Sequence, residues 1–207
     1  SRLVLISTDK AVDPVCVYGA SKMLAEELVL HASTESMEAM VVRFGNVLDS
    51  RGSIVPLFRR QIEAGGPVTV TDPEASRFFM TMPESASLVL QPGGVGTGGK
   101  LYILDMGEPV LIRSLAEQMI RFYGLEPGHD IEIEYIGLRP GERVREVLFS
   151  KDEEPVPTES PRIQRLNRNP RFNGELAELL ECLKPICYLD VERRDLYRNR
   201  RRLRSCL

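Results

Sequence analysis

Short apolar runs alternate with helical patterns along the chain, and this alternation constrains the fold more than any other feature. The runs with the length and β-branched content of buried strands lie at 2–7, 40–44 and 101–104. Apolar residues at helical spacing lie at 18–32, 53–64, 83–90, 111–123 and 175–183. Strands that alternate with helices pair in parallel within one sheet, so we predict an α/β fold.

Shorter runs and several breaks complete the predicted order. Short strands are expected at 68–70, 78–81 and 131–136, and glycine-containing connections at 45–52 and 93–99. The stretch after Lys151 is punctuated by Pro155, Pro157, Pro161 and Pro170. We predict an irregular loop there, because proline interrupts both helices and strands.

The composition excludes several classes of protein. Hydrophobic residues make up 43% of the 207 residues, which excludes a chain disordered throughout. The sequence contains no apolar run of 18 residues, the length that a membrane-spanning helix needs. Lys and Arg number 27 against 30 Asp and Glu, and the net charge of −3 gives no reason to expect nucleic acid. Only the segment 191–207 is basic. We interpret it as a solvated terminus, with contact to anionic lipid or nucleic acid as the alternative.

The cysteines and histidines predict no metal site. The four cysteines contain no Cys-x-x-Cys pair, and only His31 and His129 could add nitrogen ligands. A disulfide framework is not expected in a chain with this much apolar core, so we predict reduced thiols and a cytoplasmic protein. The chain begins in strand character and without Met, which suggests a fragment.

The segment from Gly94 to Gly99 matches the Gly-x-Gly-x-x-Gly letters of a dinucleotide site. That site needs a strand before the motif and a helix after it, so that the helix N-terminus faces the pyrophosphate. Here the predicted order is reversed, and Leu101 stands where a P-loop needs Ser or Thr. We therefore predict a plain connection between a helix and a strand.

Tyr18 and Lys22 form a Tyr-x-x-x-Lys motif, which places a phenol and an ammonium group on one face of a helix. The nearby cation favours the phenolate, which can act as a general base. The helix follows a strand that ends near Thr8, whose hydroxyl can bond a reacting oxygen at the carboxyl end of the sheet. Asp9 and Lys10 are either a solvated ion pair or the proton donor and acceptor of an elimination reaction.

Five motifs occur in order between residues 1 and 165. They are Ser7-Thr8-Asp9-Lys10-Ala11-Val12, Tyr18-Gly19-Ala20-Ser21-Lys22, Arg43-Phe44-Gly45-Asn46-Val47-Leu48, Gly65-Gly66-Pro67-Val68-Thr69-Val70-Thr71 and Gly137-Leu138-Arg139-Pro140-Gly141-Glu142. This set resembles the nucleoside-diphosphate-sugar 4,6-dehydratases of the extended short-chain dehydrogenase/reductase class, in particular the UDP-N-acetylglucosamine 4,6-dehydratase or capsular polysaccharide biosynthesis family. The resemblance implies dehydration of a UDP-N-acetyl-hexosamine, expected to be UDP-N-acetylglucosamine, to a 4-keto-6-deoxy sugar nucleotide, with NADP or NAD as cofactor.

The resemblance also implies catalytic roles for five residues. Tyr18 would take the proton of the sugar 4-hydroxyl, and Lys22 would support Tyr18 and hold the nicotinamide ribose. Thr8 would orient the 4-oxygen. Lys10 would remove the C5 proton, and Asp9 would protonate the leaving C6 hydroxyl.

Further residues would bind the cofactor and the substrate. Beside Tyr18 and Lys22, the cofactor would meet Val47, Leu48, Asp49, Ser50 and Arg51. The substrate would meet Asn46, Ile54, Thr71, Arg77, Arg139 and Glu142. The two arginines would clamp the diphosphate, because a guanidinium fork suits two phosphate oxygens. Asp49 stands where the family usually carries Gly.

The resemblance implies part of a Rossmann-like parallel sheet, without its N-terminal βαβ half, beside a smaller α/β substrate-binding domain. We assign 1–56 to the remainder of the dinucleotide-binding domain with the Tyr/Lys helix, and 57–165 to the substrate-binding portion. Strand 100–105 is expected to return to the main sheet, and 166–207 to hold a C-terminal helix and the Arg-rich tail. We expect an exposed sheet edge, little NADP⁺ affinity and no turnover from the isolated chain.

Two alternative functions stay open. A sugar-nucleotide 4-epimerase or reductase would share Tyr18 and Lys22 but does not need the acid and base supplied by Asp9 and Lys10. A truncated remnant would bind a sugar nucleotide without catalysis, which Asp49 favours. For the full-length form we expect a homo-oligomer that binds a UDP-sugar and no nucleic acid, in the cytoplasm or at the inner face of the cell membrane.

Overall fold

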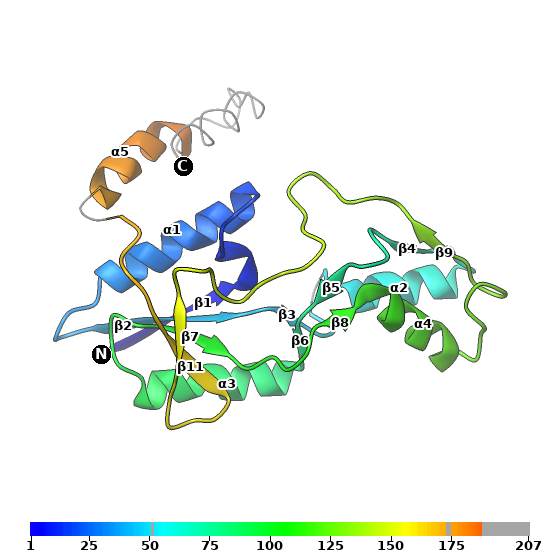
Figure 1. Cartoon of the computed structure of the whole chain (residues 1–207), viewed down its shortest axis with the longest axis horizontal. Helices are drawn as coiled ribbons and strands as arrows, with labels where there is room; N and C mark the ends of the chain where they lie inside the picture. The colour runs from blue at the N-terminus through cyan, green and yellow to red at the C-terminus, as the bar shows by residue number, and fades with distance from the viewer. Residues whose placement is uncertain (51, 173–174, 188–207) are drawn as a thin grey trace.

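The computed structural model describes residues 1–50, 52–172 and 175–187. Figure 1 shows a central sheet between helices and a smaller lobe that extends to one side of it. Two predictions from the sequence lie outside the described residues, namely the cofactor contact at Arg51 and the interpretation of the basic segment 191–207.

The central sheet has five strands in the spatial order β1-β2-β7-β11-β10. They are β1 (Arg2–Thr8), β2 (Glu38–Phe44), β7 (Leu101–Leu104), β11 (Ile163–Asn167) and β10 (Glu154–Pro157). The first three are parallel, whereas β11 and β10 are each antiparallel to the strand before them in this order. The predicted α/β fold is confirmed, and the three predicted buried strands form the parallel half of the sheet.

β10 and β11 occupy the proline-punctuated stretch, so the prediction of an irregular loop was wrong at these positions. Pro155 and Pro157 lie in β10, the outermost strand, where a residue without an N–H can face away from the ladder. At the opposite edge, β1 pairs with β2 alone among the described strands and leaves Leu3 and Ile6 exposed. An exposed edge of this kind was predicted.

Helices cover both faces of the sheet. α1 (Val17–His31) lies on one face and α3 (Met82–Val95) on the other (Figure 1). Successive residues of β2 point to opposite faces. Met40 and Val42 pack in one apolar cluster with Leu88 of α3, and Val41 packs in another with Val29 of α1. Burial on both faces explains why the run at 40–44 lacks the polar alternation of a surface strand.

α3 runs further than predicted. It begins with a capping box between Thr81 and Glu84 and continues through Pro92 to Val95, so the predicted glycine connection at 93–99 was wrong for its first residues. The helix still precedes β7, as the sequence indicated. The Gly94–Gly99 motif therefore lacks the strand–turn–helix setting of a dinucleotide site.

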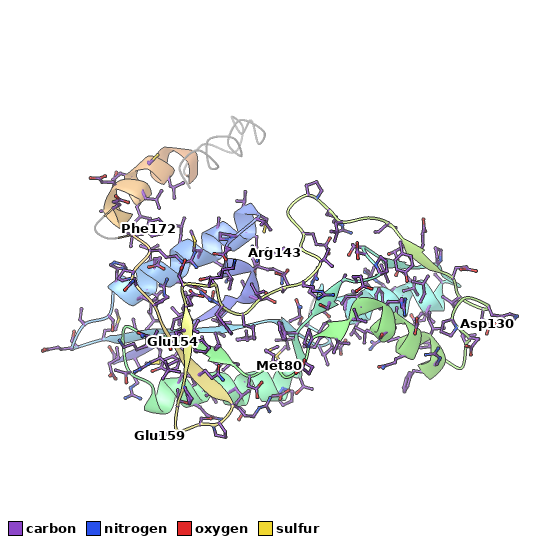
Figure 2. The ribbon with its side chains drawn as sticks, viewed as in Figure 1. Met80, Asp130, Arg143, Glu154, Glu159 and Phe172 are labelled. Atoms are coloured by element: carbon purple, nitrogen blue, oxygen red, sulfur yellow. The ribbon has the colours of Figure 1, made fainter. Side chains whose placement is uncertain are left out.

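The smaller lobe contains two helices and two pairs of short strands. They are α2 (Ile54–Glu63), α4 (Ile112–Phe122), the parallel pair β4 (Val68–Val70) and β9 (Ile133–Tyr135), and the antiparallel pair β5 (Ser76–Arg77) and β8 (Val110–Leu111). Its core consists of Phe58, Ile62, Val68, Val70, Ala75, Ile112, Ala116, Ile120 and Ile131. The pair β3 (Asn46–Val47) and β6 (Phe79–Met80) joins the lobe to the sheet, as Figure 2 shows at Met80.

The remaining elements are the 3-10 turn η1 (Asp9–Ala11) and the helix α5 (Leu176–Cys187). β7 lies in the central sheet although its neighbours along the chain include elements of the smaller lobe. The proposed domain boundaries at residues 56 and 165 stay predictions. Within the described ranges, none of the helices has the length and apolar character needed to cross a membrane.

A buried ion-pair cluster joins the sheet to α1. Arg43 of β2 is fully buried, and its Nη2 donates to Oε2 of Glu26 in α1 at 2.7 Å. Its Nη1 donates to Oε2 of Glu153 at 2.8 Å and to the carbonyl oxygen of Leu148 at 3.1 Å. Burial alone would lower the pKa of Arg43, but the hydrogen bonds and charges of Glu26 and Glu153 outweigh it and raise the pKa above its usual value. Three segments far apart in the sequence are thereby held together.

We expect Arg43→Met to lower the free energy of unfolding by about 3–5 kcal/mol, because Glu26 and Glu153 would stay buried without their cation. Urea denaturation measures the change. The control is Arg113→Met, which removes a largely exposed ion pair with Glu117 and should cost about 0.3–0.5 kcal/mol. Equal and small losses in the two variants would contradict a stabilising role for the Arg43 cluster.

The same cluster predicts a loss of stability in acid. Burial acts to raise the pKa of Glu153, but the hydrogen bonds and charge of Arg43 outweigh it and hold the pKa below the usual 4.5. The unfolded chain therefore binds this proton at a higher pH than the folded chain. The stabilisation is complete above pH 4.5 and is lost as the pH falls through the folded value.

We expect Glu153→Gln to flatten the fall in the free energy of unfolding below pH 4.5, the usual value from which the Glu153 pKa is lowered. Denaturation curves at a series of pH values measure this slope. Glu154→Gln, at the exposed neighbouring position, is the matched control and should keep the slope of the wild type. A wild-type slope in Glu153→Gln would show that another group controls acid unfolding.

Candidate active site

β1 ends in a tight polar cluster at its carboxyl end. The hydroxyl of Thr8 donates to Oδ1 of Asp9 at 2.8 Å, and Nζ of Lys10 donates to the same oxygen at 2.9 Å. The Asp9 side chain is fully buried, and its Oδ2 has no hydrogen-bond partner among the described residues. Asp9 and Lys10 therefore form an ion pair with a buried carboxylate, not the solvated pair that the sequence left open.

α1 carries Tyr18 and Lys22 one turn apart. The helix begins after Cys16, whose Sγ accepts a hydrogen bond from the Gly19 N–H at 3.4 Å. The Tyr18 residue is 54% exposed, and Lys22 is partly buried. No hydrogen bond joins the two side chains in the described part of the chain. The phenol and the ammonium are thus accessible near the carboxyl end of β1.

Gly19 allows α1 to pack directly against the turn that holds Asp9 and Lys10. A Cβ atom at position 19 would lie 2.2 Å from the carbonyl oxygen of Lys10 and 3.1 Å from Cβ of Pro14. Only a residue without a side chain fits this contact. The glycine inside the Tyr-x-x-x-Lys motif therefore sets the distance between the Tyr18 helix and the Asp9–Lys10 turn.

A cavity of about 610 Å³ is lined by residues of both the central sheet region and the smaller lobe. Nine residues predicted as site residues line it, namely Lys10, Asn46, Val47, Ser50, Ile54, Thr71, Arg77, Arg139 and Glu142. Six others are described but do not line it, namely Thr8, Asp9, Tyr18, Lys22, Leu48 and Asp49. The structure thus gathers the expected substrate contacts in one place and leaves most of the expected catalytic residues beside that place.

Glu142 is the centre of a hydrogen-bond cluster in the cavity wall. Its Oε1 accepts from the hydroxyl of Thr71 at 3.2 Å and from Nη2 of Arg77 at 3.0 Å. Its Oε2 accepts from the backbone N–H of Arg139 at 3.3 Å. Arg77 also donates to the carbonyl oxygen of Val144 at 2.9 Å. The side chains of Thr71, Arg77 and Glu142 are therefore held in one group, to which Arg139 is joined through its backbone.

Asp49 adopts a backbone conformation that favours glycine, the residue that the family resemblance led us to expect at this position. Its φ is +56°, in the left-handed region that favours Gly and that Asp tolerates better than most residues. Its carboxylate is mainly exposed and lies 3.8 Å from Nη2 of Arg59. The side chain is therefore paired at the surface and does not line the cavity.

The sequence analysis missed Cys16, Arg143 and Glu146, which also line the cavity. Arg143 lies on the long connection that passes beside the start of α1 in Figure 2, and it donates to the carbonyl oxygen of Asp13. The Glu146 side chain is only 6% exposed, and burial raises its pKa although the charge of Lys10 opposes this. None of the three lies within a motif that predicts a site, although Arg143 and Glu146 closely follow the Arg139–Glu142 motif.

The parallel strands β1, β2 and β7, with a Tyr-x-x-x-Lys helix beside β1, agree with the extended short-chain dehydrogenase/reductase class that the motifs indicated. Residues 1–168 match the model of a family described as polysaccharide biosynthesis protein. The chain belongs to this family, as the sequence motifs indicated.

Two curated relatives are longer than the region that matches this chain. The chain is 52% identical over 155 residues to the capsular polysaccharide biosynthesis protein CapD of Staphylococcus aureus. The matched region covers 74% of this chain and 26% of CapD. It is 38% identical over 157 residues to a UDP-glucose 4-epimerase of Rickettsia canadensis, which covers 74% of this chain and 45% of the epimerase. The chain therefore spans less than half the length of either relative.

Solved structures share the fold. Pen from Bacillus thuringiensis superimposes with a TM-score of 0.72 at 35% identity, over 81% of this chain and 53% of Pen. DesIV, a dTDP-glucose 4,6-dehydratase from Streptomyces venezuelae with NAD and TYD bound, gives a TM-score of 0.61 at 20% identity, over 71% of this chain and 51% of DesIV. At that identity the likeness to DesIV shows the fold alone.

The close contact at Gly19 predicts that a side chain there destabilises the protein. A second glycine offers a control substitution with the opposite effect on stability. We expect Gly19→Ala to lower the free energy of unfolding by about 1–3 kcal/mol, because α1 must move away from the Lys10 carbonyl oxygen. Gly94→Ala, in α3 with open space around it, should raise stability by up to about 1 kcal/mol, because Ala favours a helix over Gly. Thermal and urea denaturation measure both, and a stable Gly19→Ala would contradict the packing argument.

Proposed function

We propose that the protein containing this chain is an NADP-dependent sugar-nucleotide 4,6-dehydratase that acts on UDP-N-acetylglucosamine during surface polysaccharide synthesis. The observation that carries the proposal is that Lys10, Asn46, Arg77, Arg139 and Glu142 line one cavity together. Its volume of about 610 Å³ lies within the range of small-molecule sites, which supports a ligand of sugar-nucleotide size.

The charge of the cavity supports a diphosphate ligand. Its described wall carries four cationic side chains, Lys10, Arg77, Arg139 and Arg143, and only two carboxylates, Glu142 and Glu146. An excess of positive charge attracts a pyrophosphate, and guanidinium groups can bond two of its oxygens at once. We assign the diphosphate to Arg77 and Arg139 and the ribose hydroxyls to Glu142. Asn46, Ile54 and Thr71 complete the proposed nucleotide contacts.

The residues near the carboxyl end of β1 supply the proposed chemistry at the sugar. Tyr18 takes the proton of the 4-hydroxyl, and Thr8 holds the 4-oxygen. Oxidation at C4 makes the C5 proton acidic. Lys10 removes that proton, and its partner Asp9 is the acid that the family resemblance assigns to the leaving C6 hydroxyl.

Tyr18, Lys22 and residues 47–50 fit the nicotinamide end of a cofactor. Tyr18 and Lys22 are accessible hydroxyl and ammonium donors that suit a ribose, and Val47 to Ser50 lie at the junction of the two lobes. A bound NADP⁺ would supply a hydride acceptor for C4 and a hydride donor for C6. Lys22 would hold the ribose, and Val47, Leu48, Asp49 and Ser50 would face the nicotinamide. The choice of NADP over NAD and assembly as a cytoplasmic homo-oligomer belong to this proposal.

A sugar-nucleotide 4-epimerase is the second candidate, and the match to the Rickettsia canadensis epimerase favours it. Epimerisation at C4 needs Tyr18 and Lys22 but no acid and base for the loss of water. The ion pair of Asp9 and Lys10 beside the cavity therefore favours the dehydratase.

The full-length protein tests the proposal directly. With UDP-N-acetylglucosamine and NADP⁺ we expect a 4-keto-6-deoxy sugar nucleotide, identified by NMR and by a mass lower by one water. Tyr18→Phe should lower kcat by about 10²–10⁴-fold, because the general base is removed. Tyr135→Phe, at an exposed position in β9 that does not itself line the cavity, should keep the wild-type rate. A clean 4-epimer from the wild type would establish the epimerase in its place.

A further inference from the structure

Glu146 is a buried carboxyl group to which the proposed function assigns no role. Its side chain is 6% exposed, and it lines the same cavity as Lys10. Its Oε1 lies 3.9 Å from Nζ of Lys10. A buried carboxyl group beside the base of the proposed elimination can influence that reaction through the base itself.

The amine of Lys10 needs a second contact to stay at the cavity, because lysine carries its charge on a flexible four-carbon chain. Asp9 binds the amine on one side, where its Oδ1 accepts a hydrogen bond from Nζ at 2.9 Å and its side chain is fully buried. The Lys10 side chain is 30% exposed. Asp9 alone draws the amine toward the interior, whereas Glu146 offers a contact in the cavity wall.

The backbone on both sides of Glu146 is held by hydrogen bonds. The Val144 carbonyl oxygen accepts a hydrogen bond from Nη1 of Arg77 at 2.9 Å. The Leu148 carbonyl oxygen accepts one from Nη1 of buried Arg43 at 3.1 Å. The segment is therefore anchored two residues before Glu146 and two residues after it. A carboxyl group on such a segment can fix the position of a flexible partner.

The charges around Glu146 suit a contact that leaves Lys10 able to act as a base. Burial is the largest influence on Glu146 and raises its pKa, and the negative charge of Asp9 acts in the same direction. The positive charges of Lys10, Arg77 and Arg143 oppose this but do not reverse it. A carboxyl group with a raised pKa gives up its negative charge more readily. It therefore contacts Lys10 without adding a permanent second anion, which would favour the ammonium form.

The segment that carries Glu146 also joins the two ends of the cavity. Arg77, which we assign to the diphosphate, pairs with Glu142 at 3.0 Å and bonds the carbonyl oxygen of Val144. Four residues after Glu142, the side chain of Glu146 lies beside Lys10. One stretch of backbone thus carries a nucleotide contact at one end and the contact to the base at the other.

We propose that Glu146 is a positioning residue that holds the amine of Lys10 toward the ligand, so that it can reach the C5 proton of the sugar. Lys10 stays the base and Asp9 the acid of the elimination, and Glu146 acts through Lys10. Oxidation at C4 uses Tyr18 and does not depend on this contact. The inference rests on the proposed dehydratase function.

The two stages of the reaction separate this role from a general loss of structure. In the full-length protein with UDP-N-acetylglucosamine and NADP⁺, the absorbance of reduced cofactor follows oxidation at C4, and the loss of water follows elimination. We expect Glu146→Ala to slow elimination by about 10–10²-fold, because a displaced base reacts poorly, and to leave oxidation and UDP binding unchanged. Reduced cofactor should then accumulate. Glu146→Gln, which keeps an oxygen at the contact, should lose less. Glu154→Ala, at an exposed position, should match the wild type.

A double variant tests whether Glu146 acts through Lys10. We expect Lys10→Ala to slow elimination by about 10²–10⁴-fold, because the base is removed. The combination of Lys10→Ala with Glu146→Ala should be no slower than Lys10→Ala alone, because residues that act as a unit do not contribute additively. A further loss in the double variant would show that Glu146 acts on another group and would overturn the proposal.

Other results would overturn the positioning role while leaving the dehydratase intact. Elimination at the wild-type rate in Glu146→Ala would show that the contact is not used. Equal slowing of oxidation and elimination, or weaker binding of UDP with a lower melting temperature, would show a structural role alone. Formation of a 4-epimer by the wild type, without loss of water, would instead reject the proposed function itself.

Discussion

The candidate site depends on the buried guanidinium of Arg43. It binds Glu26 of the Tyr18 helix, Glu153 before β10 and the carbonyl oxygen of Leu148, so one side chain joins α1, β2 and the returning segment. Buried ion pairs contribute little net stability compared with apolar packing, but a missing partner is costly. The cluster therefore specifies one arrangement of three segments. It therefore fixes α1, which carries Tyr18, relative to the segment around residues 148–153.

Two close backbone contacts add to this frame at the cavity. At Gly19 a side chain would collide with the Lys10 carbonyl oxygen, and at Gly141 a Cβ would lie 2.9 Å from Cβ of Cys16. Gly141 also has a φ of +82°, a conformation that side chains disfavour. The first contact brings α1 onto the Asp9–Lys10 turn, and the second brings the Arg139–Glu142 motif onto the start of α1. At both glycines a close backbone approach excludes a side chain, and at Gly141 the positive φ disfavours one as well.

Local patterns predicted the parallel strands, because each is an apolar run with its own signal. The resemblance to the family supplied the nine cavity residues, of which Ser50, Ile54 and Arg77 lie outside its five motifs. Glu146 and Arg143 carried no signal of their own, since their roles arise from a contact with residues more than 125 positions earlier in the chain. β10 was missed because Pro155 and Pro157 break strands in general, and only its place at the sheet edge makes them harmless. The burial of Asp9 likewise depends on Gly45 and the packed sheet, which composition does not reveal.

The charged residues of the cavity wall form two groups, one around Arg77 and Glu142 and the other around Lys10. Glu142 pairs with the guanidinium of Arg77 and accepts a hydrogen bond from the backbone N–H of Arg139, so it offsets part of the charge of Arg77 while the wall keeps an excess of positive charge. Around Lys10, carboxyl groups are in the majority, with Asp9 at 2.9 Å and Glu146 at 3.9 Å from its Nζ. Under the proposed function, the arginine end would attract the diphosphate and the uncharged sugar would lie near Lys10, so the charge of the wall would orient the substrate.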